Sequence, residues 1–219
     1  GPDVAAYAIE KVTGTDFETY VRQHFFQPLE MSSASYRYPE QDHLLATLYQ
    51  DGEVSDYWHI AMRPSGSINA SARDMANFVQ FFINRGVANG DRLLSQQSIQ
   101  KMETPHSSIA ANANMKTGYG LGNYTSHYKN FVFHGHSGGV NGGVARLAYL
   151  ANEGVGFGVM MNSDKSYAFK PIYKEIQRYI TFGMSGPKRP EIKPISEKIA
   201  EQYTGYYRQV NPRQALFSF

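Results

Sequence analysis

The chain has 219 residues, a formal net charge of +2 at pH 7, and no cysteine. Its length suits one or two domains with a sizeable core, and its apolar stretches are far too short to cross a bilayer. The small charge, which forms no basic run, excludes an electrostatic surface for nucleic acid. Disulfides and thiolate metal sites are excluded too, and the seven histidines lack ligand spacing with carboxylates on one helix. We therefore expect no metal and no other cofactor.

The first third of the chain predicts two helices and a less regular segment. Residues 4–14 place apolar side chains at helix spacing and end on a glycine, which is a stop signal. Residues 16–24 predict a second helix, with an aspartate as its N-cap. Residues 33–38 predict a short strand or an extended loop, and residues 44–63 show no clear period.

Ser71 predicts the start of a third helix. Asp74 stands at the capping-box position, and Gly86 marks the end. The helix carries an apolar stripe suited to packing on a core, formed by Met75, Phe78, Val79 and Phe82. A further helix is expected after the N-capping Ser95, and residues 104–116, rich in Ser, Ala and Asn, predict a loop.

The last third of the chain predicts an antiparallel sheet. An apolar strand begins at Phe131 and runs into a histidine and a glycine cluster. Residues 144–150 and 155–161 predict two more strands. A helix over residues 171–182 is expected to cover the sheet with three side chains, those of Ile172, Ile176 and Tyr179. Helices packed on such a sheet form an α+β sandwich, which is the fold class we predict.

The segment His136-Ser137-Gly138-Gly139 is the strongest candidate site. Glycines let a backbone or a ligand approach closely because no Cβ stands in the way. A strand edge with a histidine beside such glycines would suit a substrate acyl group. The residues alone leave a second interpretation open, a glycine-rich hairpin with a surface histidine, because short Gly/His patterns recur by chance. His134, on the same strand face, is a rival to His136.

Several motifs occur in an order that resembles one superfamily of hydrolases. They are residues 4–14, 17–22 and 26–31 (a helix pair with a Pro-Leu-Gly-Met-like turn), residues 64–78 (a glycine turn and helix), residues 118–122, and the His136 segment. Their order resembles the serine beta-lactamase and penicillin-binding-protein superfamily, above all its class C-like branch of esterases and D-aminopeptidases. Glu30 replaces the usual glycine of the turn. The resemblance covers residues 4–180 and implies a beta-lactamase/transpeptidase-like fold, incomplete at the N-terminus.

In that superfamily the nucleophile belongs to a Ser-x-x-Lys motif, and a Tyr-x-Asn motif follows. The resemblance places both before the helix that begins near Val4, so we expect this chain to be the C-terminal part of a hydrolase and to be inactive alone. Literal matches to the family's motifs occur elsewhere, at Ser98–Lys101, Ser185–Lys188, Tyr128–Asn130 and Lys116–Gly118. We expect none of them to be catalytic, because two-residue patterns recur by chance and Ser98 falls on a surface helix.

The resemblance also assigns roles in a substrate and oxyanion wall. His136 would contact the substrate or the missing tyrosine, and Gly138 would admit the acyl chain. The Gly139 N–H would donate to the oxyanion, and Ser137 lies between these residues. The implied reaction is acyl transfer through a serine ester, on an ester, amide or peptide, with a beta-lactam or D-amino-acid peptide among the candidates. A histidine that is mostly neutral near pH 7 favours an esterase, amidase or peptidase over an efficient beta-lactamase.

Two other classes of function stay open. One is a catalytically silent module that binds peptidoglycan-like or D-amino-acid ligands on the same scaffold, and the other is a structural domain. The expected partners are a small-molecule or peptide substrate and either the missing N-terminal segment or a second copy of the chain, because an open sheet edge associates readily. The sequence leaves the compartment open, and the resemblance implies a periplasmic or secreted bacterial protein.

The predicted domain organisation has three parts. Residues 1–182 form the C-terminal part of the hydrolase domain. Residues 183–196, rich in proline and charge, form a linker. Residues 197–219 resemble the opening of the small β-domain that often follows these hydrolases, or else they form a tail that packs on the body.

Overall fold

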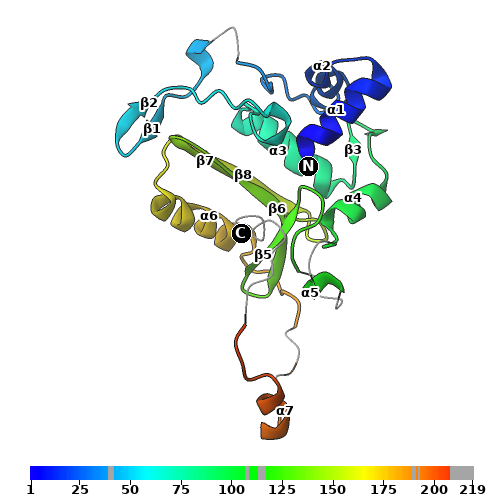
Figure 1. Ribbon diagram of the computed structural model, residues 1–219, viewed down its shortest axis with the longest axis vertical. Helices are drawn as coiled ribbons and strands as arrows, with labels where there is room; N and C mark the ends of the chain where they lie inside the picture. Colours follow the sequence, from blue (N-terminus) through cyan, green and yellow to red (C-terminus); the bar gives the residue numbers. More distant parts are fainter. Residues whose placement is uncertain (39–41, 107–108, 113–116, 189–190, 192, 208–219) are drawn as a thin grey trace.

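A four-stranded antiparallel sheet forms the centre of the protein (Figure 1). A computed structural model describes residues 1–38, 42–106, 109–112, 117–188, 191 and 193–207. The strands are adjacent in both sequence and space, in the order β5 (Tyr124–Tyr128), β6 (Phe131–Val140), β7 (Gly143–Leu150) and β8 (Val155–Met161). Three of them were predicted. Strand β5 was missed because its sequence, Tyr-Thr-Ser-His-Tyr, lacks the apolar alternation of a half-buried strand.

One face of the sheet packs against α3 (Ala72–Ile83). The predicted capping box is present: the Ser71 hydroxyl accepts the Asp74 N–H at 3.2 Å, and the Asp74 carboxylate accepts the Ser71 N–H at 2.8 Å. Phe82 stacks on Tyr149 of β7 with ring centroids 5.2 Å apart. Helix and sheet are close at Gly158 of β8, where a Cβ would collide with the Met75 side chain.

The N-terminal helices extend the layer formed by α3 (Figure 1). Helix α1 (Pro2–Thr13) ends at Gly14 with φ +69°, as its stop signal predicted. Helix α2 (Phe17–Val21) is capped by Asp16, whose carboxylate accepts the Thr19 N–H at 3.1 Å, and it continues as a π-helical turn, η1 (Arg22–Phe26). Helix α4 (Gln96–Glu103) begins after Ser95, again as predicted. The first core cluster joins these helices to the sheet through buried residues that include Phe26, Ile99 and Tyr149.

Helix α6 (Ser166–Ile180) covers the opposite face of the sheet (Figure 1). It packs Tyr173, Ile176 and Ile180 on a second core cluster, which contains Phe131, Phe133, Ala148, Leu150 and Phe157. The predicted stripe was therefore partly wrong. Ile176 faces the sheet, but Ile172 and Tyr179 are 44% and 78% exposed. The helix also begins five residues before its predicted start and contains Pro171. The layers of helices on an antiparallel sheet confirm the predicted α+β class.

Short elements complete the described chain. Strands β1 (Leu48–Gln50) and β2 (Glu53–Ser55) form one hairpin, and β3 (Val87–Ala88) and β4 (Asp91–Arg92) form another. Two 3-10 turns, η2 (Asp42–Leu44) and η3 (Arg63–Ser65), lie at the two ends of residues 44–63, the segment whose sequence shows no clear period. The predicted extended segment at 33–38 forms one isolated bridge, between Ser35 and Asn69.

Two predictions fall partly on residues that the structure leaves undescribed. The expected loop at 104–116 contains a short helix, α5 (Ile109–Asn112), and residues 107–108 and 113–116 lie outside the described residues. Residues 197–219 begin with α7 (Glu197–Gln202), which stands apart from the sheet (Figure 1). The rest of the expected β-domain, from residue 208, lies outside the described residues, so that domain and its boundary stay predictions. Every described helix is too short or too polar to span a bilayer.

Candidate active site

The second half of β6 extends past the end of β5 within the described structure. Strand β5 pairs with β6 only from Phe131 to Gly135, whereas β7 pairs with it as far as Val140. Residues 136–140 therefore extend beyond β5 and direct their outer main-chain groups away from the sheet. A Cβ at Gly138 would meet no atom within 4 Å, so the described residues leave space beside this glycine. An edge of this kind can take an extended ligand through main-chain hydrogen bonds.

His136 begins this edge and is held by two tyrosines. The Tyr119 hydroxyl lies 3.0 Å from His136 Nε2. The ring of Tyr119 is edge-on to the imidazole at 5.8 Å, and the ring of Tyr124 is edge-on at 5.4 Å. Tyr119 comes from the Gly-Tyr-Gly-Leu-Gly segment that the sequence singled out, and Tyr124 is the first residue of β5. The structure therefore brings two of the predicted motifs together.

Ser137 does not share a face with His136, because successive side chains of a strand alternate. Its hydroxyl lies 2.6 Å from the Tyr124 hydroxyl and 3.5 Å from Arg146 Nη1. Arg146 also donates to the Ser126 hydroxyl at 2.6 Å, and its guanidinium lies 4.4 Å from the centre of the Tyr173 ring of α6. Ser137 thus contributes its side chain to the α6 side of the sheet and only its main chain to the His136 edge.

His134, the rival histidine, is packed into the protein. Its ring lies 5.9 Å from that of Tyr149, and its Nδ1 is buried without a hydrogen-bond partner among the described residues. Burial lowers the pKa of His134 because the charged imidazolium loses its hydration, with Arg85 adding to the shift and Glu103 opposing it. The ring is therefore a neutral packing group rather than an edge group.

A buried polar network stands behind the candidate edge, and sequence reasoning missed it. Asn123 is 2% exposed; its amide donates to the Tyr149 hydroxyl at 2.8 Å, and its side-chain oxygen accepts the Gly135 N–H at 3.0 Å. Tyr149 in turn donates to Glu103 at 2.9 Å, and Arg85 lies 2.5 Å from the same carboxylate oxygen. Burial, followed by the negative charge of Glu103, raises the pKa of Tyr149. The hydroxyl is therefore a permanent donor.

The structure places most of the literal motif matches that the sequence offers, and their catalytic inactivity stays a prediction. Ser98 is in α4, and its hydroxyl contacts that of Ser95 at 2.8 Å, as expected for a surface helix start. Tyr128 ends β5, and the Lys129–Asn130 turn follows it. Ser185 lies in a stretch without helix or strand. The first residue of the Lys116–Gly118 match lies outside the described residues.

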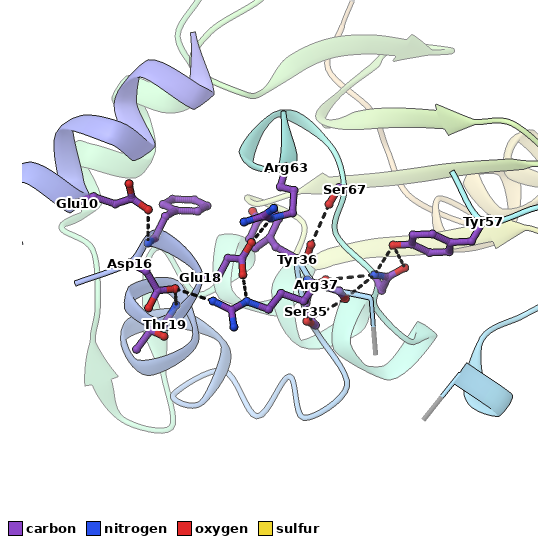
Figure 2. Close-up of polar contacts among 12 residues, drawn as sticks. Glu10, Asp16, Glu18, Thr19, Ser35, Tyr36, Arg37, Tyr57, Arg63 and Ser67 are labelled. Atoms are coloured by element: carbon purple, nitrogen blue, oxygen red, sulfur yellow. Dashed lines mark hydrogen bonds and ion pairs between the residues drawn. The ribbon is translucent and has the colours of Figure 1, made fainter. Parts of the chain in front are cut away.

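A second polar site lies between α1, α2 and η3 (Figure 2). A cavity of about 300 Å³ is bordered by Glu18, whose carboxylate contacts both Arg37 and Arg63. Arg37 also contacts Asp16 at 3.2 Å. These charges neutralise one another, and both arginines are largely exposed, so the ion pairs contribute little to stability. Their evident role is to tie α2 to the segments on either side. Among the described residues, no group of three or more His, Asp and Glu side chains is arranged to hold a metal.

Comparison with known proteins identifies the family. Residues 2–178 match the model of the Beta-lactamase family, and the chain belongs to that family. It is 33% identical over 129 residues to the putative penicillin-binding protein PbpX of Bacillus subtilis (strain 168), an alignment that covers 56% of this chain and 29% of the relative.

Two solved structures share the fold. One is the octameric penicillin-binding protein homologue from Pyrococcus abyssi, with a TM-score of 0.59 and 23% identity over 77% of this chain and 40% of that one. The other is a beta-lactamase/D-alanine carboxypeptidase from Pseudomonas syringae, with a TM-score of 0.65 and 15% identity over 80% of this chain and 57% of that one. The chain thus spans less than two thirds of the length of each protein compared here.

Proposed function

We propose that the whole protein is a serine hydrolase that forms an acyl-enzyme with an ester, amide or peptide, and that this chain supplies its acyl-binding strand. The observation that carries the proposal is the part of β6 that extends past β5, with its two exposed glycines, Gly138 and Gly139, beside His136. Membership of the Beta-lactamase family supports serine hydrolase chemistry in general. The name of the Bacillus relative supports penicillins as probes of the site.

The proposed roles are those that the family resemblance implies, and the position of these residues on β6 supports them. A serine on a segment outside these 219 residues attacks the carbonyl carbon, and its proton passes to a neighbouring lysine or tyrosine. The negative charge that develops on the carbonyl oxygen is stabilised by the Gly139 N–H. The open space beside Gly138 accepts the acyl chain. His136 contacts the substrate from the first position of the edge. Collapse of the tetrahedral species expels the leaving group, and water then releases the acyl group from the serine.

Acylation by a fluorophosphonate and by a fluorescent penicillin tests this proposal. Both probes are applied to the whole protein and to the 219-residue chain, and the labelled residue is mapped by mass spectrometry. We expect the label on a Ser-x-x-Lys serine outside this chain, and no label on the chain alone. Failure of both probes to label the whole protein would favour the catalytically silent binding module. Labelling of Ser98 in the 219-residue chain would overturn the assignment of the nucleophile to another segment.

The proposal includes association of this chain with another polypeptide segment or a second copy of itself. Helix α1 exposes three apolar side chains, those of Val4, Tyr7 and Val12. Strand β6 adds residues 137–140, which extend past the end of β5 in the described part of the chain. An apolar helix face and an exposed strand edge are the features that promote association in water.

A further inference from the structure

We propose that Tyr119 is a positioning residue for His136: its hydroxyl donates to Nε2 and so fixes both the orientation and the tautomer of the imidazole. The oxygen and nitrogen lie 3.0 Å apart, within the range of a hydrogen bond. A phenol is a better donor than acceptor, and a neutral imidazole accepts through only one nitrogen. Donation to Nε2 therefore leaves the imidazole proton on Nδ1. The inference rests on the proposed function only for the part that His136 takes in the acyl site.

The backbone around Tyr119 is fixed on both sides. The Gly118 N–H donates to the Thr125 hydroxyl at 2.7 Å, and the Thr125 N–H donates to the Gly118 carbonyl at 2.9 Å. Gly120 lies against the end of α4, where a Cβ would collide with the Met102 carbonyl oxygen. The Leu121 N–H donates to that same carbonyl at 2.9 Å. Tyr119 is thus presented to His136 from a rigid turn rather than from a loose loop.

The same turn is tied to the strand that carries His136. Asn123, at the end of the turn, has its main-chain oxygen bonded to the Gly120 N–H at 2.7 Å and its side chain bonded to the Gly135 N–H. Gly135 immediately precedes His136. The same hydrogen bonds therefore fix the Tyr119 turn and the His136 backbone relative to each other. A positioning contact requires this, because a small displacement of a reacting group lowers the reaction rate.

Tyr124 provides a matched control within the chain. Its ring contacts the His136 ring edge-on, but its hydroxyl bonds Ser137 instead of the imidazole. A Tyr124→Phe variant keeps the ring contact and removes a hydroxyl that does not touch His136. A Tyr119→Phe variant also keeps its ring contact but removes the hydroxyl that does. The two variants separate the hydrogen bond from aromatic packing.

The test is the imidazole nitrogen spectrum of the 219-residue chain, labelled with ¹⁵N-histidine and recorded at alkaline pH where the rings are neutral. The His136 signals are assigned by their loss in His136→Ala. We expect one dominant Nδ1–H tautomer in the wild type, a smaller share of that tautomer in Tyr119→Phe, and no change in Tyr124→Phe. The signals of His134 should stay in place in both variants, which verifies the fold. An unchanged His136 spectrum in Tyr119→Phe, or an equal change in Tyr124→Phe, would overturn the proposal.

A reciprocal measurement keeps the proposal testable if Tyr119→Phe unfolds. The ¹³Cζ shift of Tyr119 should move in His136→Ala, since the phenol then loses its acceptor, and an unmoved shift would contradict the hydrogen bond. Neither spectrum depends on activity. If the whole protein is not acylated but Tyr119→Phe changes the tautomer of the His136 imidazole, the proposed function fails and the positioning role stands. If the proposed function and the positioning role both hold, Tyr119→Phe in the whole enzyme should lower kcat by about 10-fold with little change in KM.

Discussion

The Asn123 side-chain oxygen accepts the Gly135 N–H across the β5–β6 pair at 3.0 Å. Gly135 separates the packed His134 from the edge residue His136. This bond therefore holds β6 at the last residue that pairs with β5. The amide end of Asn123 reaches Tyr149 at 2.8 Å, which links the strand to the buried Glu103 carboxylate. The edge is thus anchored in the core at Gly135, the residue that precedes it, while no described atom lies within 4 Å of a Cβ placed at Gly138.

Removal of the Asn123 side chain should destabilise the protein. In Asn123→Ala the buried Gly135 N–H loses its acceptor, and an orphaned buried donor costs about 1–3 kcal/mol. The free energy of unfolding, measured with urea, should fall by that amount. Asn152→Ala, in the exposed β7–β8 turn, is the control and should change it by less than about 0.5 kcal/mol. Equal stabilities for the two variants would contradict the network.

Glycine is required at Gly135 for packing but not at Gly138. Gly135 has φ +156°, and a Cβ there would collide with the Leu147 carbonyl oxygen. Gly135→Ala should therefore cost about 2–4 kcal/mol of unfolding free energy. Gly138→Ala, with open space beside it, should cost less than about 0.5 kcal/mol. If thermal or urea unfolding showed a larger loss of stability for Gly138→Ala than for Gly135→Ala, the edge would be packed by residues outside the described chain.

Stability should depend on pH through His134. Burial lowers its pKa in the folded state, so the unfolded chain binds more protons just below the ordinary histidine pKa of about 6.5. The free energy of unfolding should therefore decrease as the pH falls from about 6.5 toward the lowered pKa, by up to about 1.4 kcal/mol per pH unit from this group. His134→Gln should remove that part of the slope. A slope that is unchanged in His134→Gln would assign the dependence to other groups.

The chain should self-associate through its exposed apolar side chains. We expect light scattering after size-exclusion chromatography to give a mass above that of the 24.6 kDa monomer, rising with concentration. Val4→Ser combined with Val12→Ser should shift the distribution toward monomer, since both side chains lie on the exposed part of α1. A wild-type chain that stays monomeric at high concentration would argue against this surface.

Local signals predicted much of this fold, and long-range contacts account for what was missed. Helix starts at Asp16, Ser71 and Ser95 were predictable because a cap and its partner lie three residues apart. The sheet-facing stripe of α6 was partly misassigned because the sequence leaves two apolar registers open. Strand β5 is polar and owes its structure to pairing with β6.

In the candidate site, too, local sequence signals were predictable and long-range contacts were not. The His136 segment carries a glycine pattern that is visible in the sequence, and the Tyr119 turn was visible only as a motif. Their contact spans 17 residues, and the bond between Tyr149 and Glu103 spans 46. No local period encodes such pairs, so Asn123, Tyr149 and Glu103 could not be assigned to a network before the strands were placed.

The most direct test of the central claim is the acylation rate of the whole protein by a fluorescent penicillin or fluorophosphonate, compared between His136→Ala and His134→Ala. If β6 forms the acyl-binding wall, His136→Ala should lower the second-order rate constant by about 10²-fold, as the loss of one aligned polar contact does. His134→Ala should act mainly on stability and reduce the rate far less. Full activity of His136→Ala would contradict the account, and loss of activity only in His134→Ala would move the site two residues along the strand.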